Sequence, residues 1–263
     1  MTTMTINRRR WLQLLPGAGG LMLAVGLDGL PSIAQAQDAP KFGADGMPNG
    51  WRDNPTTFVS IGKDGAVTIL VHRSEMGQGI RTSLPRVVAD ELEADWARVK
   101  VQQAPGDEGK FGNQDTDGSR SMRHWFDPMR RCGASARQML EQAAAKQWNV
   151  PLDQVQAKNH QIVHLPSGRV LGYGALAQAA AQLEVPPRTS LKLKNAKDFR
   201  YIGKLDTHLV DAEVIVTGKS QYGIDTRLPG QLYAVIARPP VLGGKLRSLD
   251  SAEAMKVPGV LKI

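Results

Sequence analysis

The chain has 263 residues, of which 41% are hydrophobic and 22% charged, a composition typical of a folded globular protein rather than a disordered one. The net charge is +8, but the basic residues are scattered and only 5% of the residues are aromatic, which argues against a nucleic-acid-binding surface. A single cysteine, Cys132, excludes an internal disulfide, a zinc ribbon and an iron–sulfur cluster held by this chain alone.

The first 36 residues have the features of an export signal. Three arginines at 8–10 precede an apolar, glycine-rich stretch at 14–30, and a small-residue pattern ends at Ala36. Asp28 interrupts the apolar stretch, which weighs against a permanent membrane anchor. Adjacent arginines before bulky apolar residues are typical of a twin-arginine signal, with an ordinary secretory leader as the alternative. In either case we expect a periplasmic protein.

Hydrophobic periodicity indicates a mixed α+β domain at 56–184, preceded by an extended segment at 37–55 that is rich in glycine, proline and aspartate. The predicted elements are a β-hairpin of strands 58–61 and 67–71, a helix at 83–96 with Ser83 as its N-cap, a strand at 99–102, a long loop at 104–120, a helix at 121–148 that Pro128 kinks or splits, β segments at 155–164 and 169–173, and a small helix at 175–183.

The pattern of apolar and polar residues changes after this domain. Residues 185–205 contain two prolines and six basic residues with little periodicity, which predicts a linker. Short alternating runs then predict strands at 212–216, 221–225 and 231–238. Residues 206–263 are therefore expected to form a small, incomplete β-rich domain, because so short a piece would leave strand edges unpaired.

The first motif that could bind a ligand lies between a predicted strand and a predicted helix. Gly77 and Gly79 allow a ligand to approach the backbone, and N–H groups at a helix start favour an anion. The amide of Gln78 can both donate and accept hydrogen bonds, which suits the edge of a heterocycle. A plain structural turn is the alternative interpretation.

A second loop of the same kind precedes the long helix. Gly118, Ser119 and Ser121 form a Gly/Ser loop, and Arg120 has the fork geometry that binds a phosphate. The alternative is an ordinary capped helix with Ser119 or Ser121 as N-cap and Arg120 in solvent. Two such loops in one small domain favour a phosphate-rich ligand.

Residues 73–82, 112–123 and 222–240 resemble the molybdenum-binding subunit of the xanthine dehydrogenase and aldehyde oxidase superfamily. The similarity is greatest to isoquinoline oxidoreductase beta subunits and to periplasmic, cytochrome-linked aldehyde dehydrogenases. The Met-Gly-Gln-Gly motif at 76–79 is its most diagnostic part, and the resemblance covers essentially the whole mature chain. It implies a molybdopterin-binding domain followed by the start of a small β domain called the hammerhead, at 206–263.

The resemblance also implies a cofactor, partners and a substrate. The cofactor is molybdenum–molybdopterin cytosine dinucleotide, and the residues implied to bind it are Gly77, Gln78, Gly79, Thr82, Gly118, Ser119, Arg120 and Ser121. The implied partners are a small iron–sulfur subunit and a periplasmic c-type cytochrome that accepts electrons. The implied substrate is an aldehyde or an N-heteroaromatic compound, oxidised with oxygen from water.

No catalytic or metal-ligating residue is predicted in this chain. The family's glutamate base lies near the end of a much longer chain, and Glu75 is not assigned that role, so the 263-residue chain alone is expected to be inactive. The five histidines show no metal-ligand spacing and are expected to pack or face solvent. Two alternatives stay open: a non-catalytic periplasmic remnant of such a subunit that binds no cofactor, and a basic periplasmic binding protein unrelated to molybdenum.

Overall fold

The computed structural model describes residues 49–204 and 208–263, and the chain divides into two compact units at Ser220. The predicted export signal and most of the segment 37–55 lie outside the described residues. In the described part, no helix has both the length and the apolar character needed to cross a membrane.

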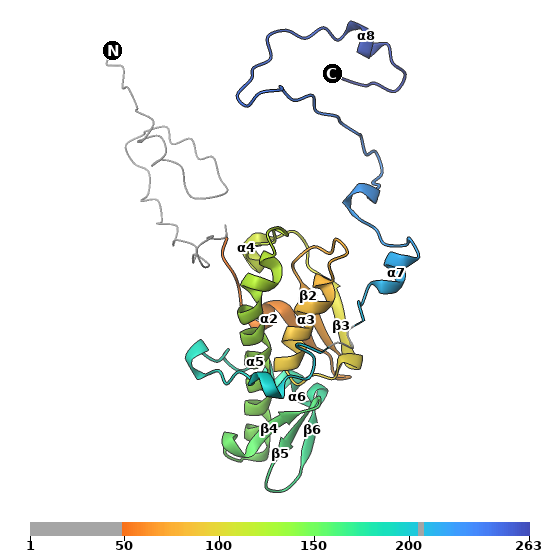
Figure 1. Ribbon diagram of the computed structural model, residues 1–263. Coiled ribbons are helices and arrows are strands. Elements are labelled where there is room, and N and C mark those ends of the chain that lie inside the picture. The colour runs from red at the N-terminus through yellow and green to blue at the C-terminus, as the bar shows by residue number, and fades with distance from the viewer. Residues whose placement is uncertain (1–48, 205–207) are drawn as a thin grey trace, which may run out of the picture. The chain divides into compact units, whose positions relative to one another are not determined.

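The first unit carries nearly all of the regular structure (Figure 1). Its α-helices and strands are α2 (Pro55–Phe58), β1 (Val59–Ile61), β2 (Val67–Val71), α3 (Ile80–Glu91), β3 (Val99–Gln103), α4 (Glu108–Phe111), α5 (Arg120–Trp148), β4 (Val155–Lys158), β5 (Gln161–His164), β6 (Val170–Gly172), α6 (Tyr173–Ala180) and α7 (Ala212–Val216). Short 3₁₀ helices lie at Trp96–Arg98, Leu152–Gln154, Arg188–Ser190 and Ala196–Asp198. The second unit has a 3₁₀ helix at Gly223–Asp225 and α8 (Ala252–Met255).

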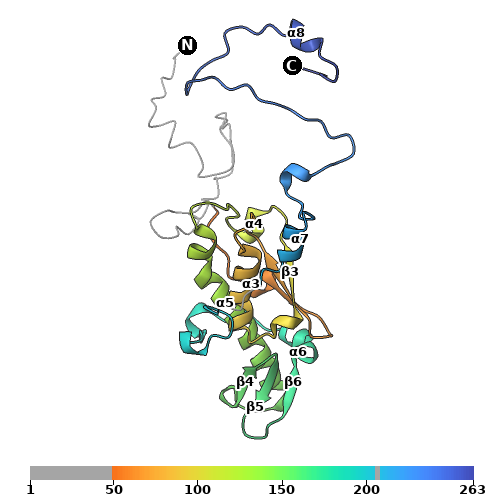
Figure 2. The same ribbon diagram turned by 45° about the vertical axis from the view of Figure 1, so that its right-hand side comes forward.

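Two three-stranded sheets form within the described residues. In the first, β1 pairs antiparallel with β2, which confirms the predicted hairpin, and β2 pairs parallel with β3 so that Val67 lies opposite Val99. A parallel pair needs a crossover, and α3 provides it. In the second sheet, β4, β5 and β6 form an antiparallel meander at the C-terminal end of α5 (Figure 2). The predicted α+β class of this domain is confirmed.

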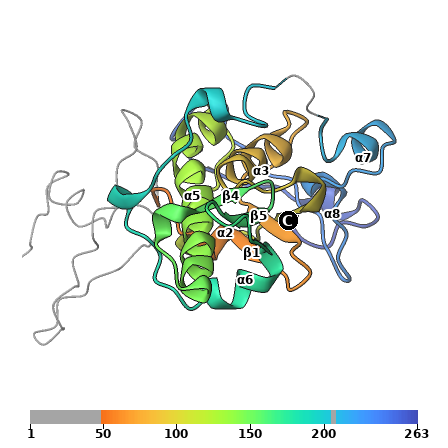
Figure 3. The same ribbon diagram turned by 90° about the horizontal axis from the view of Figure 1, so that it is seen from below.

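Helices α3 and α5 lie side by side and form the centre of the core (Figure 3). Alternate residues of β2 (Val67, Ile69 and Val71) are buried beneath them. The predicted split of the long helix at Pro128 is wrong, because α5 continues from Arg120 to Trp148. A proline in a helix removes one backbone hydrogen bond, and burial of Pro128 within a 29-residue helix packed along its length offsets that loss.

The start of α3 differs from its prediction. The helix begins at Ile80, three residues before the expected N-cap Ser83, and ends at Glu91. Gly79 precedes it with a φ of 84°, a left-handed conformation that favours glycine. The hydroxyl of Ser83 donates to the carbonyl of Gly79 and so cannot cap the helix start.

Most of the segment predicted as a linker is fixed to the rest of the domain. Asp90 of α3 accepts hydrogen bonds from the Lys194 side chain and from the backbone N–H groups of Arg200, Tyr201 and Ile202. We call residues 188–202 the strap. The strap is therefore not a free spacer, because buried carboxylates of α3 bind it. These carboxylates are far away in the sequence, so periodicity does not reveal the contacts.

The strands predicted at 212–216, 221–225 and 231–238 are not formed. Residues 212–216 form the helix α7, and none of the described residues after 208 is in a strand. A strand requires a neighbouring strand that pairs with its backbone, and none of the described residues after 208 is paired in this way. The apolar side chains there are also left uncovered; Val235, for example, is 99% exposed. The hammerhead assignment of 206–263 stays a prediction.

Candidate functional site

The two glycine-containing loops meet at one pocket with a volume of about 350 Å³. The residues that line it are Met76, Gln78, Ile80 and Ser83 from the first loop and α3, and Thr116, Asp117, Gly118, Ser119, Ser121 and Met122 from the second loop and α5. The backbone N–H of Ser74 donates to Thr116 Oγ1 at 3.0 Å and joins the loops. The structure therefore brings together four of the predicted site residues: Gln78, Gly118, Ser119 and Ser121.

The predicted anion site at the start of α3 is filled by a side chain of the protein itself. Glu75 Oε1 accepts hydrogen bonds from the backbone N–H groups of Gly77 and Gly79, each at 2.8 Å, and Glu75 Oε2 accepts from that of Arg81 at 3.1 Å. The expectation that these groups favour an anion is correct, since a carboxylate binds there. These amides are therefore not free donors in this structure, and direct contact of Gly77 and Gly79 with a ligand stays a prediction.

Gln78 lines the pocket with its amide already partly engaged. Its Oε1 accepts from the backbone N–H of Met76 at 2.6 Å, and its Nε2 donates to the carbonyl of Ser74 at 2.9 Å. These bonds fix the amide plane, and each end keeps further capacity, because an amide carries two N–H donors and two lone pairs. Gln78 can thus present one donor and one acceptor to a ligand.

Gly79 and Thr82 face the segment 209–211 instead of the pocket. The hydroxyl of Thr82 accepts from the backbone N–H of Val210 at 2.9 Å, and Arg81 forms an ion pair with Asp211 at 2.9 Å. A Cβ atom added at Gly79 would lie 2.7 Å from Leu209 Cδ2. In this structure the side chain of Thr82 is buried beneath this segment, and its contact with a ligand stays a prediction.

The second loop enters α5 through two left-handed residues, Gly118 and Ser119, with φ values of 48° and 56°. Ser119 occupies the N-cap position, but its side chain makes no capping hydrogen bond. Arg120 does not line the pocket; its Nε lies 3.6 Å from Asp117 Oδ1. The structure thus retains Gly118, Ser119 and Ser121 as pocket residues and assigns Arg120 to an ion pair beside them.

Arg73 is a functional candidate that the sequence did not reveal. It is 0% exposed, its Nη1 donates to the backbone carbonyl and to Oδ1 of Asn113, and its Nε donates to Ser121 Oγ at 3.0 Å. Burial lowers the pKa of Arg73 to about 10 against the opposing effect of Asp115, so the guanidinium is still charged at neutral pH. A signal was present, since Arg73 follows the apolar strand β2 almost directly.

The buried histidines pack or form hydrogen bonds inside the domain, and the cysteine is buried. His72 lies 3.9 Å from the ring of Trp125, and burial lowers its pKa to about 3, so its ring is neutral at physiological pH. Burial raises the pKa of the Cys132 thiol and makes it unreactive. Among residues 49–204 and 208–263, no group of three or more His, Cys, Asp or Glu side chains is placed to hold a metal ion.

Replacing Glu75 by alanine is expected to loosen the first loop. The amides of Gly77, Gly79 and Arg81 lose their acceptor, so their hydrogen exchange should accelerate about tenfold. Mass spectrometry of the peptide 74–82 measures this change. The exposed Glu184 supplies the matched control variant E184A. Equal exchange in E75A and the unmodified protein would show that the loop does not depend on this carboxylate.

Comparison with known proteins shows the family of the chain. The chain matches the molybdopterin cofactor-binding domain family over residues 36–213. It is 33% identical to the isoquinoline 1-oxidoreductase subunit beta of Brevundimonas diminuta, an alignment that covers 98% of this chain and 36% of that protein. It is 32% identical to the membrane-bound aldehyde dehydrogenase [pyrroloquinoline-quinone] of Gluconacetobacter polyoxogenes, over 82% of this chain and 28% of that protein.

Among solved structures, the chain is similar to quinoline 2-oxidoreductase from Pseudomonas putida 86, with 17% identity and a TM-score of 0.39 over 47% of this chain and 16% of that one. The chain spans about a third of the length of the two curated relatives, 36% and 28% respectively.

Proposed function

This chain belongs to the molybdopterin cofactor-binding domain family, and we propose that the pocket between its two loops binds part of a molybdopterin cofactor in its cytosine dinucleotide form. We further propose that the protein acts in the large subunit of a molybdenum hydroxylase, which oxidises an aldehyde or hydroxylates an N-heteroaromatic compound. The family assignment agrees with the resemblance to the xanthine dehydrogenase and aldehyde oxidase superfamily found in the sequence.

One observation carries the proposal: a single pocket joins the amide of Gln78 to the hydroxyls of Ser119 and Ser121, although the two loops are about forty residues apart in the sequence. Amide and hydroxyl groups match the donors and acceptors of a pterin edge and of a phosphate. Arg73 adds a buried positive charge behind Ser121. The residues of the pocket therefore fit a ligand that is both heterocyclic and anionic.

In this proposal the chain binds and orients the cofactor. The bound cofactor would supply the two-electron redox chemistry for oxidation of the substrate with oxygen from water. Gln78 orients the ligand with one donor and one acceptor, while Ser119 and Ser121 bind it from the opposite side of the pocket. Glu75 fixes the loop that carries Gln78 and does not itself face the ligand.

The proposed partners and location follow from the sequence and the relatives. The protein from Brevundimonas diminuta is named as a subunit, which supports a multi-subunit enzyme with a small iron–sulfur subunit. The single cysteine supports a separate protein for the clusters. A periplasmic c-type cytochrome as electron acceptor agrees with the paired arginines of the leader, which support export in a folded state.

The test is the cofactor content of the natural full-length protein. Molybdenum is measured by mass spectrometry and the pterin by fluorescence after oxidation, in the unmodified protein, in a Q78A/S119A double variant and in Q178A, an exposed control on α6. We expect about one molybdenum per chain, a loss of about tenfold or more in the double variant, and no change in the control. An unmodified protein without molybdenum or pterin would support the remnant that binds no cofactor.

A further inference from the structure

Arg73 is a buried cation that forms no direct ion pair with a carboxylate in the described part of the chain. Its hydrogen bonds go to Asn113 and Ser121. Other poorly exposed cations are paired: Arg130 lies 2.7 Å from Glu91 and Lys194 lies 2.8 Å from Asp90. The carboxylates of Asp115, Asp117 and Glu108 oppose the cost of this burial without cancelling it, since the pKa of Arg73 is still lowered to about 10. Because a buried charge is costly unless it is fully compensated, Arg73 can accommodate a further anion.

The unused donor of Arg73 is buried and lies on the same edge of the guanidinium as Nε. Nη1 is engaged by Asn113, while Nη2 makes no hydrogen bond to any residue in 49–204 or 208–263. In the planar guanidinium, one N–H of Nη2 points the same way as the N–H of Nε. Nε donates to Ser121, which lines the pocket. The free donor is therefore directed toward the Ser121 side.

Ser121 can connect Arg73 to a ligand through hydrogen bonds. Its Oγ accepts from Arg73 Nε, so its own hydroxyl proton remains to be donated, and its side chain lines the pocket. A hydroxyl that accepts from a cation becomes a stronger donor, because hydrogen bonds in a chain polarise one another. The most suitable acceptor for such a donor is an anionic oxygen.

The N-termini of α3 and α5 beside the pocket differ in which groups neutralise their partial positive charge. The start of α3 is occupied by the Glu75 carboxylate. At the start of α5, Ser119 makes no side-chain cap, and the positive end of a 29-residue helix favours negative charge. Asp117 also lines the pocket, but its charge is offset by Arg120 at 3.6 Å. An anion is therefore better accommodated on the α5 side.

We propose that Arg73 is a positioning residue for a phosphate-type anion that binds against Ser119 and Ser121, acting through the Ser121 hydroxyl and supplying the counter-charge from beneath the pocket. The inference rests on the proposed function in one respect: it identifies that anion with a phosphate of the proposed cofactor. The recognition of the anion by Arg73 and Ser121 does not depend on the rest of the cofactor.

The test measures binding of inorganic pyrophosphate to the cofactor-free full chain by calorimetry at constant ionic strength. We expect R73M and S121A to weaken binding at least about tenfold, with R73K between them and the unmodified protein, because lysine keeps the charge but loses the fork. The control R188M also removes one positive charge, from the surface pair with Asp53, and should change the dissociation constant less than about twofold.

S121A keeps the proposal testable if R73M does not fold, since it removes only a hydroxyl. A merely structural role of Arg73 would lower the melting temperature without changing the rise in melting temperature that pyrophosphate causes. Unchanged pyrophosphate affinity in S121A and R73K, or no binding by the unmodified chain at millimolar pyrophosphate, would overturn the proposal.

Pterin and molybdenum content, measured in the same variants, separates this proposal from the proposed function. If pyrophosphate binding depends on Arg73 and Ser121 but the unmodified protein carries no pterin, the anion site stands and the proposed function fails. If the unmodified protein carries pterin and S121A and R73K retain both the pterin and the pyrophosphate affinity, the proposed function stands and the role of Arg73 is refuted.

Discussion

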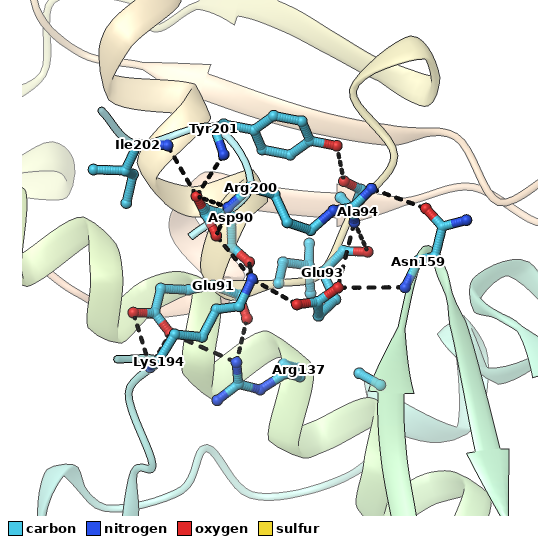
Figure 4. A network of polar contacts seen from close by, with 12 residues as sticks. Asp90, Glu91, Glu93, Ala94, Arg137, Asn159, Lys194, Arg200, Tyr201 and Ile202 are labelled. Carbon is cyan, nitrogen blue, oxygen red and sulfur yellow. Dashed lines mark hydrogen bonds and ion pairs between the residues drawn. The ribbon is translucent and has the colours of Figure 1, made fainter. Parts of the chain in front are cut away.

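Replacing Asp90 by alanine is expected to lower the free energy of unfolding by about 3–5 kcal/mol, the range for breaking a buried charge pair. Asp90 is 0% exposed and accepts from Lys194 Nζ at 2.8 Å and from the backbone N–H groups of Arg200, Tyr201 and Ile202 at 2.9–3.0 Å (Figure 4). Without the carboxylate these donors stay partly buried and unsatisfied, so the strap should detach from α3.

Urea unfolding followed by circular dichroism measures the stability change, and limited trypsin digestion measures release of the strap at its exposed Lys192 and Lys197. The variant D198A removes an exposed carboxylate from the strap itself and should leave both readouts unchanged. A loss below about 1 kcal/mol for D90A, with unchanged cleavage, would mean that the other contacts hold the strap.

The contribution of Asp90 should also depend on pH. Burial by itself raises the pKa of Asp90, but the hydrogen bonds from Lys194, Ile202 and Tyr201 outweigh it and hold the pKa below its ordinary value. The unfolded chain therefore binds more protons than the folded one as the pH falls. The stabilisation is fully present above about pH 4, the unfolded value, and is lost below it as the pH falls through the folded pKa, so the difference between D90N and the unmodified protein should shrink there.

Replacing Gly133 by alanine is expected to destabilise the protein by about 1–3 kcal/mol, the usual cost of overpacking a core. A Cβ atom at this position of α5 would overlap the carbonyl oxygen of Val88 and lie 2.9 Å from Glu91 Cβ, so α3 and α5 would have to separate. Alanine favours helix formation over glycine by about 1 kcal/mol, which opposes the effect without removing it. Valine at the same position should cost more.

Thermal and urea unfolding of G133A measure this effect. Gly106 supplies the matched control, because a Cβ atom added there meets no atom within 4 Å. G106A should leave the free energy of unfolding within about 0.5 kcal/mol of the unmodified protein. If G133A is as stable as G106A, the helices can separate at no measurable cost, and the close approach at Gly133 is not a determinant of the fold.

The sequence by itself predicted those parts of the fold that depend on neighbouring residues. Alternation in 58–61 and 67–71 predicted β1 and β2, and helical spacing predicted α5. The two glycine loops could be recognised for the same reason, since their motifs are short and continuous. That both loops line one pocket followed from their resemblance to a known family, and the structure places Gln78 and Ser121 there together.

Only the tertiary structure decided what each polar group of these loops contacts. Glu75 fills the helix start where the glycine motif predicted an anion site, Thr82 accepts a hydrogen bond from Val210, and Arg73 lies buried behind Ser121. The strap depends on a carboxylate 112 residues away from Ile202. Such partners are chosen by burial and by the position of distant backbone, and no local pattern records them. The strands predicted within 212–238 do not form for the same reason, because a strand needs a neighbouring strand to pair with.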